Sequence, residues 1–172
     1  MLQQAKNWQL GWFSGACKEV AFGSSYDGPI KGQINYDVSG VAQTPVVVKV
    51  GDYFVGFNHQ AKHNANTNEG GNQVTIQKAQ GSGYVQSWLV AKLNTGGTFS
   101  TDVDGFLLRV TVNSINTNAD TGVTQVSIVY GDCLNDAACR DENTCNGAET
   151  CNLGTGICDA GQVSRFLSDH IM

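Results

Sequence analysis

Short apolar runs alternate with turn-forming residues from about residue 30 to residue 130. The runs are rich in Val, Ile, Tyr, Phe and Thr, and Gly, Asn and Asp interrupt them at intervals of roughly 8 to 12 residues. This pattern predicts a series of short strands. The expected strands span residues 32–38, 45–50, 53–58, 73–79, 84–93, 105–115 and 123–130, with weaker candidates near Val20 and Phe99.

Alternation with a period of two is clearest after residue 105. Phe106, Leu108, Val110 and Val112 share one face of the expected strand, which predicts that they are buried. The Gly-Asp pair at residues 51–52 is typical of a tight hairpin turn. No stretch has the 3.6-residue period of a long amphipathic helix, and no spacing indicates alternating strands and helices. The sequence therefore predicts an all-β fold, an antiparallel β-sandwich or jelly-roll-like domain.

Charge is distributed unevenly along the 172 residues. Acidic and basic residues cancel over residues 1–130, eight against eight, whereas residues 131–161 contain six acidic residues and one Arg. The net charge of −5 therefore arises in the second segment. No basic patch is present in the sequence, which argues against nucleic acid as a partner and against attraction to anionic lipid. No apolar stretch has the length needed to span a membrane.

A cysteine-rich segment follows the expected β domain, which ends near Gly131. Five of the six cysteines lie within 26 residues, and the sixth stands far upstream. This density predicts disulfides and therefore an extracellular, oxidising location. Zinc is the alternative, but structural zinc sites favour closely paired cysteines, which this segment lacks. The disulfide candidates are Cys17, Cys133, Cys139, Cys145, Cys151 and Cys158.

Five cysteines cannot all pair with one another, so the segment needs a partner from elsewhere. Cys17, or a cysteine outside this chain, is expected to supply it. The N-terminal residues lack the basic region and the apolar run of a signal peptide. We therefore expect the chain to be part of a longer secreted protein.

The sharpest candidate for chemistry is the pair His59 and His63. Two histidines four residues apart on a helix can bind one zinc ion, and Glu69 follows at a spacing suited to a third ligand. Gln60 stands where a hydrolytic site needs a general base, and an amide cannot accept the proton of a metal-bound water. The surrounding Asn and Gly residues favour a loop. We therefore expect a solvated loop, with no catalytic residue and no metal ligand, and keep the zinc site as the alternative.

Other candidate residues have ordinary structural interpretations. Exposed aromatic residues can bind sugars or proteins, but the strand pattern favours core positions, for Trp88 in particular. The available aromatic residues are Tyr53, Tyr84, Trp88 and Phe99. The acidic residues of the tail can bind calcium, but they lack the register of a calcium loop and fit a solvated surface. They are Asp132, Asp136, Asp141 and Glu142. A Ser-His-Asp triad would have to use His59, His63 or His170, and is not expected.

The N-terminal sequence AKNWQLGWF, residues 5–13, resembles a segment of the gametolysin-type metalloproteases. These are secreted zinc peptidases of algae and related protists, also described as autolysins and as matrix-metalloprotease-like. In that family a similar sequence lies at the end of the catalytic domain. The β region that follows is similar to the family's C-terminal domain, and the tail around residues 145–158 resembles a cysteine-rich repeat of secreted proteins. The most similar β stretches are residues 46–50, 52–58, 69–75 and 87–93, and the resemblance covers about residues 4–130.

The resemblance implies a domain organisation. Residues 1–15 would be the end of a metallopeptidase catalytic domain, residues 16–131 a β-sandwich, residues 132–161 a disulfide-rich segment and residues 162–172 a loose tail. The family's HExxH zinc helix, third histidine and Met-turn have no counterpart in this sequence. The resemblance therefore supplies no catalytic residue, and zinc is expected as a cofactor of the full-length family protein and not of this chain.

The expected function follows from this organisation. The chain would be the C-terminal fragment of a secreted gametolysin-like zinc metalloprotease that acts on extracellular-matrix glycoproteins, and it would be inactive alone. Its expected partners are the upstream catalytic domain of the same protein and an extracellular-matrix glycoprotein. The alternative is a stand-alone secreted β-sandwich module for binding or adhesion.

Overall fold

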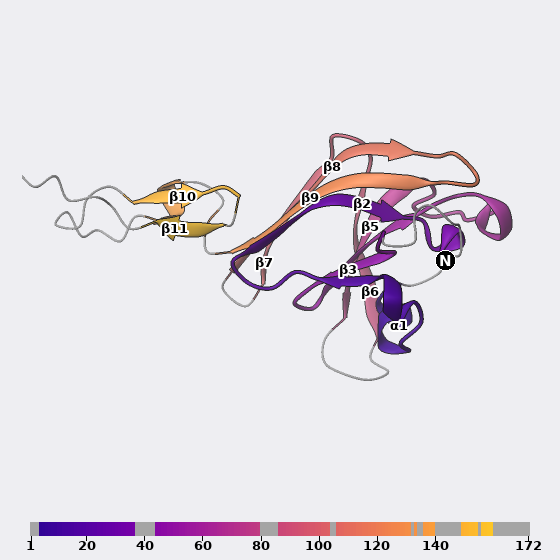
Figure 1. The fold of residues 1–172 in the computed structure, drawn as a ribbon, viewed down its shortest axis with the longest axis horizontal. Helices are drawn as coiled ribbons and strands as arrows, with labels where there is room; N and C mark the ends of the chain where they lie inside the picture. Colours follow the sequence, from indigo (N-terminus) through magenta and orange to yellow (C-terminus); the bar gives the residue numbers. More distant parts are fainter. Residues whose placement is uncertain are drawn as a thin grey trace, which may run out of the picture.

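Two facing β-sheets form the body of the protein in the computed structural model (Figure 1). The structure describes residues 4–36, 44–79, 86–103, 106–131, 133, 136–139, 149–154 and 156–159. In spatial order, the first sheet contains β1 (Cys17–Glu19), β3 (Val47–Val50), β4 (Tyr53–Asn58), β5 (Gln73–Ala79) and β6 (Ser87–Leu93). The second sheet contains β2 (Ser24–Lys31), β9 (Val123–Gly131), β8 (Phe106–Asn116) and β7 (Thr98–Val103). The predicted all-β fold is confirmed.

Smaller elements complete the described chain. A small hairpin beyond the second sheet consists of β10 (Thr150–Asn152) and β11 (Ile157–Asp159), as Figure 1 shows. The helical elements are α1 (Gln4–Gln9) and the short 3₁₀ helices η1 (Ser14–Ala16), η2 (Gln33–Asn35), η3 (Lys62–Asn64) and η4 (Asp136–Cys139).

The strand expected over residues 32–38 is wrong over residues 32–36, the part of it that the structure describes. β2 ends at Lys31, and the chain then turns into η2. Two hydrogen bonds hold this turn: the Lys31 N–H donates to the Pro45 carbonyl and the Gly32 N–H donates to the Gly122 carbonyl (3.0 Å each). The true strand lies just before, over Ser24–Lys31. In the sequence, the polar residues and the proline of this stretch are typical of a loop. An edge strand, however, also tolerates proline.

One pair of strands also departs from the expected antiparallel arrangement. β1 runs parallel to β3, with Cys17 opposite Val47, whereas the other strand pairs in the described sheets are antiparallel. The reason is the topology, because β2 lies in the other sheet and separates β1 from β3 along the chain. Parallel neighbours need such a crossover instead of a hairpin.

The main core lies between the two sheets. Leu108, Val110 and Val112 of β8 are fully buried, and Phe106 is partly buried and packs against the same core. The predicted register of this strand is therefore confirmed. Partner residues from the first sheet include Val55 of β4.

A second apolar cluster covers the outer face of the first sheet. Ala5 of α1 is fully buried there, and the ring of Trp8 meets Phe54 of β4 edge to face, with centroids 6.1 Å apart. The Ala5 N–H donates to Oε1 of Gln77 on β5 (3.2 Å). β4 is consequently buried on both faces, and all six of its residues are buried.

Candidate binding cleft

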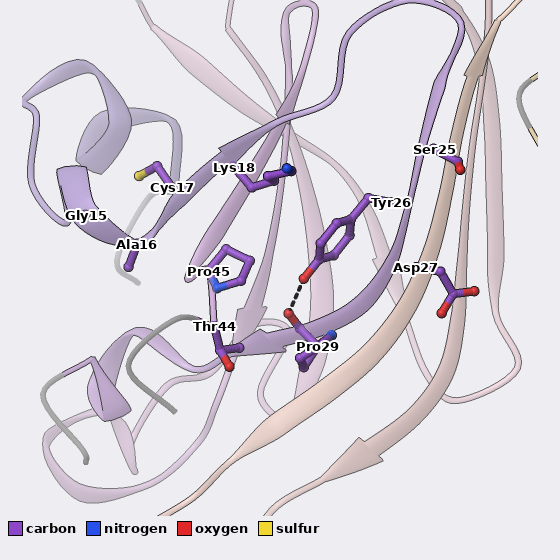
Figure 2. A pocket seen from close by; sticks show the side chains of 10 residues that line it. All are labelled: Gly15, Ala16, Cys17, Lys18, Ser25, Tyr26, Asp27, Pro29, Thr44 and Pro45. Carbon is purple, nitrogen blue, oxygen red and sulfur yellow. Dashed lines mark hydrogen bonds between the residues drawn. The ribbon is translucent and has the colours of Figure 1, made fainter. Parts of the chain in front are cut away.

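A cleft of about 640 Å³ opens between the edges of the two sheets (Figure 2). Its walls come from β1, the edge strand of the first sheet, and β2, the edge strand of the second. Figure 2 shows the side chains of Lys18, Tyr26 and Pro45 in the space between these strands. The cleft thus exists only because the two sheets pack face to face and bring β1 and β2 to the same side of the sandwich.

The two edge strands carry features that block strand addition. Pro29 of β2 has no N–H to offer, and its carbonyl oxygen accepts a hydrogen bond from the Tyr26 hydroxyl (2.6 Å). Lys18 places a charge on β1 beside the cleft. Proline and charged side chains are common means of protecting sheet edges from pairing with another chain. The cleft is therefore better suited to side-chain contacts with a ligand than to an added strand.

Two titratable groups that line the cleft, Cys17 and Tyr26, favour their neutral forms. Burial raises the pKa of the Cys17 thiol, whose Sγ donates to the Phe13 carbonyl (3.3 Å). Burial, and to a smaller extent the neighbouring Asp27 carboxylate, raises the pKa of Tyr26. A thiol with a raised pKa is a poor nucleophile because the thiolate is the reactive form. Of these two groups, Tyr26 points into the cleft and presents a neutral phenol there (Figure 2).

His59 is buried, so the solvated loop expected around it is wrong for this residue. The residue is 2% exposed, and its ring stacks on Phe57, with centroids 5.4 Å apart. Nδ1 lies 2.7 Å from Oδ1 of Asn35, and Nε2 lies 3.3 Å from the Thr117 carbonyl oxygen. The adjoining crevice of about 10 Å³ has barely the room of one water molecule. Burial, and more weakly the charge of Lys62, lowers the pKa of His59, against the opposite effect of the Thr117 hydrogen bond.

The other two residues of the alternative zinc site lie elsewhere on the surface. His63 is exposed on η3, and the exposed Glu69 carboxylate lies 3.4 Å from Nζ of Lys92. Within the described ranges, the group of ligand atoms close enough to share a metal ion consists of Cys133, Cys139 and Cys151 and contains neither histidine. The structure thus does not bring His59, His63 and Glu69 together.

The cysteine segment contains two disulfides, as the sequence predicts. Cys133 pairs with Cys151 and Cys139 pairs with Cys158, with Cα atoms 5.9 and 5.5 Å apart. The three sulfur atoms within metal-sharing distance belong to these two bridges. Cys17 is a free thiol, so of the two expected partners for a tail cysteine Cys17 is wrong, and a cysteine outside this chain stays a prediction. Cys145 lies outside the described residues.

Trp88 is not a core residue, contrary to expectation. It is 49% exposed on β6, and Val90 beside it on the same face is also exposed. Ala91 and Leu93 of this strand face the core instead. Both faces of this strand carry apolar residues, so the alternation in the sequence cannot show which face is buried.

The other aromatic and acidic candidate residues lie in different parts of the molecule. Tyr53 is buried and Phe99 is partly buried in the core, whereas Tyr84 lies outside the described residues. Asp136 has a structural role, because its Oδ1 accepts a hydrogen bond from the Cys151 N–H (2.9 Å). Outside the described residues lie Asp132, Asp141, Glu142 and His170.

Comparisons with known proteins returned no match: no family model, curated protein or solved structure is similar to the chain at a significant level. In the described residues, every helix is too short or too polar to cross a membrane.

Proposed function

We propose that this protein is the non-catalytic accessory region of a secreted gametolysin-type zinc metalloprotease. In this role the β-sandwich holds the catalytic domain and guides it to extracellular-matrix glycoproteins. The observation that carries the proposal is the position of residues 5–13, the stretch that resembles the end of a catalytic domain. This stretch packs on the outer face of the first sheet through Ala5, Trp8 and Phe13.

The contacts of this stretch are those of an integral part of the sandwich. Ala5 is buried and hydrogen-bonded to Gln77, and the Val46 N–H donates to the Ala16 carbonyl (2.8 Å) where the segment joins the first sheet. A catalytic domain continuous with this segment would be fixed close to the sandwich, because the stretch that resembles its end is itself packed on the first sheet. Such fixed geometry suits a module that positions a peptidase on its substrate.

The two disulfides support an extracellular location. Structural disulfides persist in oxidising compartments and are rare in the cytosol. The tail cysteines Cys133, Cys139 and Cys151 are buried around the bridges, as expected for structural cysteines.

The cleft between the sheet edges favours a second candidate function, a stand-alone secreted binding or adhesion module. A concave site of several hundred Å³ is the usual size of a ligand pocket, and this cleft measures about 640 Å³. Both the accessory region and the stand-alone module would bind a ligand, but only the accessory region would be part of a peptidase.

Immunopurification from the native source distinguishes the two functions. An antibody against the recombinant sandwich should recover a secreted species larger than 18.3 kDa that cleaves gelatin and loses this activity with a zinc chelator. A recovered species of about 18.3 kDa without peptidase activity would support the stand-alone module instead.

The recombinant chain gives a second test. Supplied with zinc, it should not cleave gelatin or casein, because Gln60 cannot act as a base and His59 is enclosed. Zinc-dependent cleavage that is lost in a His59→Ala variant would contradict the non-catalytic assignment.

A further inference from the structure

A second hollow lies on the opposite side of β1 from the cleft. It measures about 310 Å³ and is lined by Trp8, Gly11, Trp12, Cys17 and Glu19. Successive residues of a strand point to opposite faces, so Lys18 faces the cleft while Glu19 faces this hollow. Neither the resemblance nor the proposed function assigns a role to this hollow.

The two indole rings of the hollow are held in different ways. Trp8 is fixed by its edge-to-face contact with Phe54 and by Nζ of Lys49, which lies 5.6 Å from its ring centroid. Trp12 is 56% exposed, the highest exposure among the large hydrophobic residues Leu10, Trp12, Phe22, Tyr36 and Trp88. A large apolar ring left in water at a concave site is typical of a binding residue.

The backbone around Trp12 explains this exposure. Gly11 and Phe13 both have positive φ angles, 69° and 63°, and left-handed conformations are unfavourable for a residue such as Phe13. The Phe13 ring packs against Tyr36, with centroids 4.5 Å apart, and thereby anchors the turn. The chain is thus bent on both sides of Trp12, which keeps the indole at the surface.

Glu19 of the hollow's lining forms an ion pair without net charge with Lys49, which lies beside the hollow over Trp8. Nζ of Lys49 lies 2.5 Å from Oε1 of Glu19, and the Glu19 side chain is 56% exposed. Carboxylate oxygens accept hydrogen bonds and the ammonium group donates them, so the pair can bind several hydroxyl groups. A purely apolar ligand would remove this pair from water without replacing its hydrogen bonds, which is costly.

We propose that this hollow binds a neutral carbohydrate, with a sugar ring on Trp12 and Trp8 and its hydroxyl groups on Glu19 and Lys49. A sugar ring has one face of C–H groups, which suits the negative face of an indole, and a rim of hydroxyl groups. The neutral ion pair attracts neither anions nor cations strongly, which favours an uncharged polar ligand. The inference rests on the proposed function only for the source of the sugar, the glycans of extracellular-matrix glycoproteins.

Affinity electrophoresis of the recombinant chain tests the proposal, with laminarin, xyloglucan, mannan or arabinogalactan in the gel. At least one of these neutral or weakly charged polysaccharides should retard the wild-type protein. Trp12→Ala should weaken that binding about tenfold or more, equivalent to about 1.4 kcal/mol. Glu19→Gln should weaken it less, because the amide keeps one acceptor and the shape of the side chain.

Trp88→Ala is the matched control, since Trp88 is a similarly exposed indole on β6, at the opposite edge of the first sheet. Its retardation should equal that of the wild type, and circular dichroism should show that all variants are folded. Absence of retardation in every gel, or equal loss in the Trp88→Ala and Trp12→Ala variants, would overturn the proposal. Because peptidase activity is measured on the native species, failure here leaves the proposed function intact. Binding of deglycosylated matrix protein that depends on Trp12 would instead identify a polypeptide partner and overturn the sugar assignment.

Discussion

The imidazole of His59 lies directly against the backbone of Gly122, where a Cβ atom would come within 2.1 Å of Nδ1. This contact joins the loop after β4 to the loop before β9. Gly122→Ala should therefore lower the free energy of unfolding by about 1 to 3 kcal/mol, the usual cost of overpacking a filled site. Urea denaturation followed by tryptophan fluorescence measures the change.

Gly15→Ala is the control for this substitution, because a Cβ atom at Gly15 would have no neighbour within 4 Å. Its stability should be close to that of the wild type. Equal stability of the Gly122→Ala variant and the wild type would contradict the close packing of His59.

The buried imidazole should make stability depend on pH. Burial lowers the pKa of His59 in the folded protein below its ordinary value of 6.5, so the unfolded chain takes up the proton more readily. The contribution of the neutral His59 side chain to the free energy of unfolding is fully present above about pH 6.5 and is lost as the pH falls through that value. The melting temperature should fall between pH 7.5 and pH 5.5, and His59→Gln should reduce this slope. The exposed His63→Gln serves as control, and the same slope in the wild type and the His59→Gln variant would contradict the assignment.

Pro29 should protect the free edge of β2 from pairing with another chain. The Lys31 N–H points away from β9 to the Pro45 carbonyl, so the nitrogen of residue 29, two positions earlier, faces the same free edge. Pro29→Ala adds an N–H donor there and should promote self-association through the edge. Light scattering after size exclusion at increasing protein concentration should detect dimers of this variant. Pro45→Ala makes the same change outside a strand and should stay monomeric, and a monomeric Pro29→Ala would refute the protective role.

Reduction should unfold the cysteine segment and leave the sandwich folded. The bridges close loops with sequence separations of 18 and 19 residues, and each is worth about 3 kcal/mol by the loop-entropy estimate. Trypsin should therefore cut after Arg140 faster in the presence of dithiothreitol, while residues 44–131 stay resistant. Mass spectrometry of the quenched, fully reduced digest measures both regions. Cys17→Ser should behave like the wild type because Cys17 is a free thiol. Equal resistance of the tail in both conditions, or its restoration by zinc after reduction, would show that metal binding holds the segment.

The sequence is most informative about strands that contribute to a single core. Residues 53–58 and 73–79 are strands with the predicted bounds, and the alternation from Phe106 to Val112 gives the correct face. The same reasoning fails for Trp88, because β6 is apolar on both faces and only the position of the opposite sheet decides between them. β2 is missed because edge strands tolerate polar residues and proline.

The candidate sites are less predictable because they depend on pairs of residues far apart in the sequence. His59 belongs to a loop of Asn and Gly residues, and its burial depends on Gly32, Asn35 and Gly122, which only the folded sheets bring close. Lys18 and Tyr26 likewise meet at the cleft because β1 and β2 are the edges of different sheets. Trp12 carries a sequence signal, as part of the motif of residues 5–13, but its exposure depends on the positive φ angles of its neighbours.

The two disulfides overlap along the chain, since Cys139 lies inside the loop closed by Cys133 and Cys151, and Cys158 lies beyond it. Any single break of the backbone between Cys133 and Cys158 therefore leaves the two pieces covalently joined by at least one bridge. A nicked molecule would keep the same mass apart from one added water and would migrate as one chain until it is reduced. Peptide-bond cleavage in this segment, even in surroundings rich in peptidases, need not release its C-terminal part.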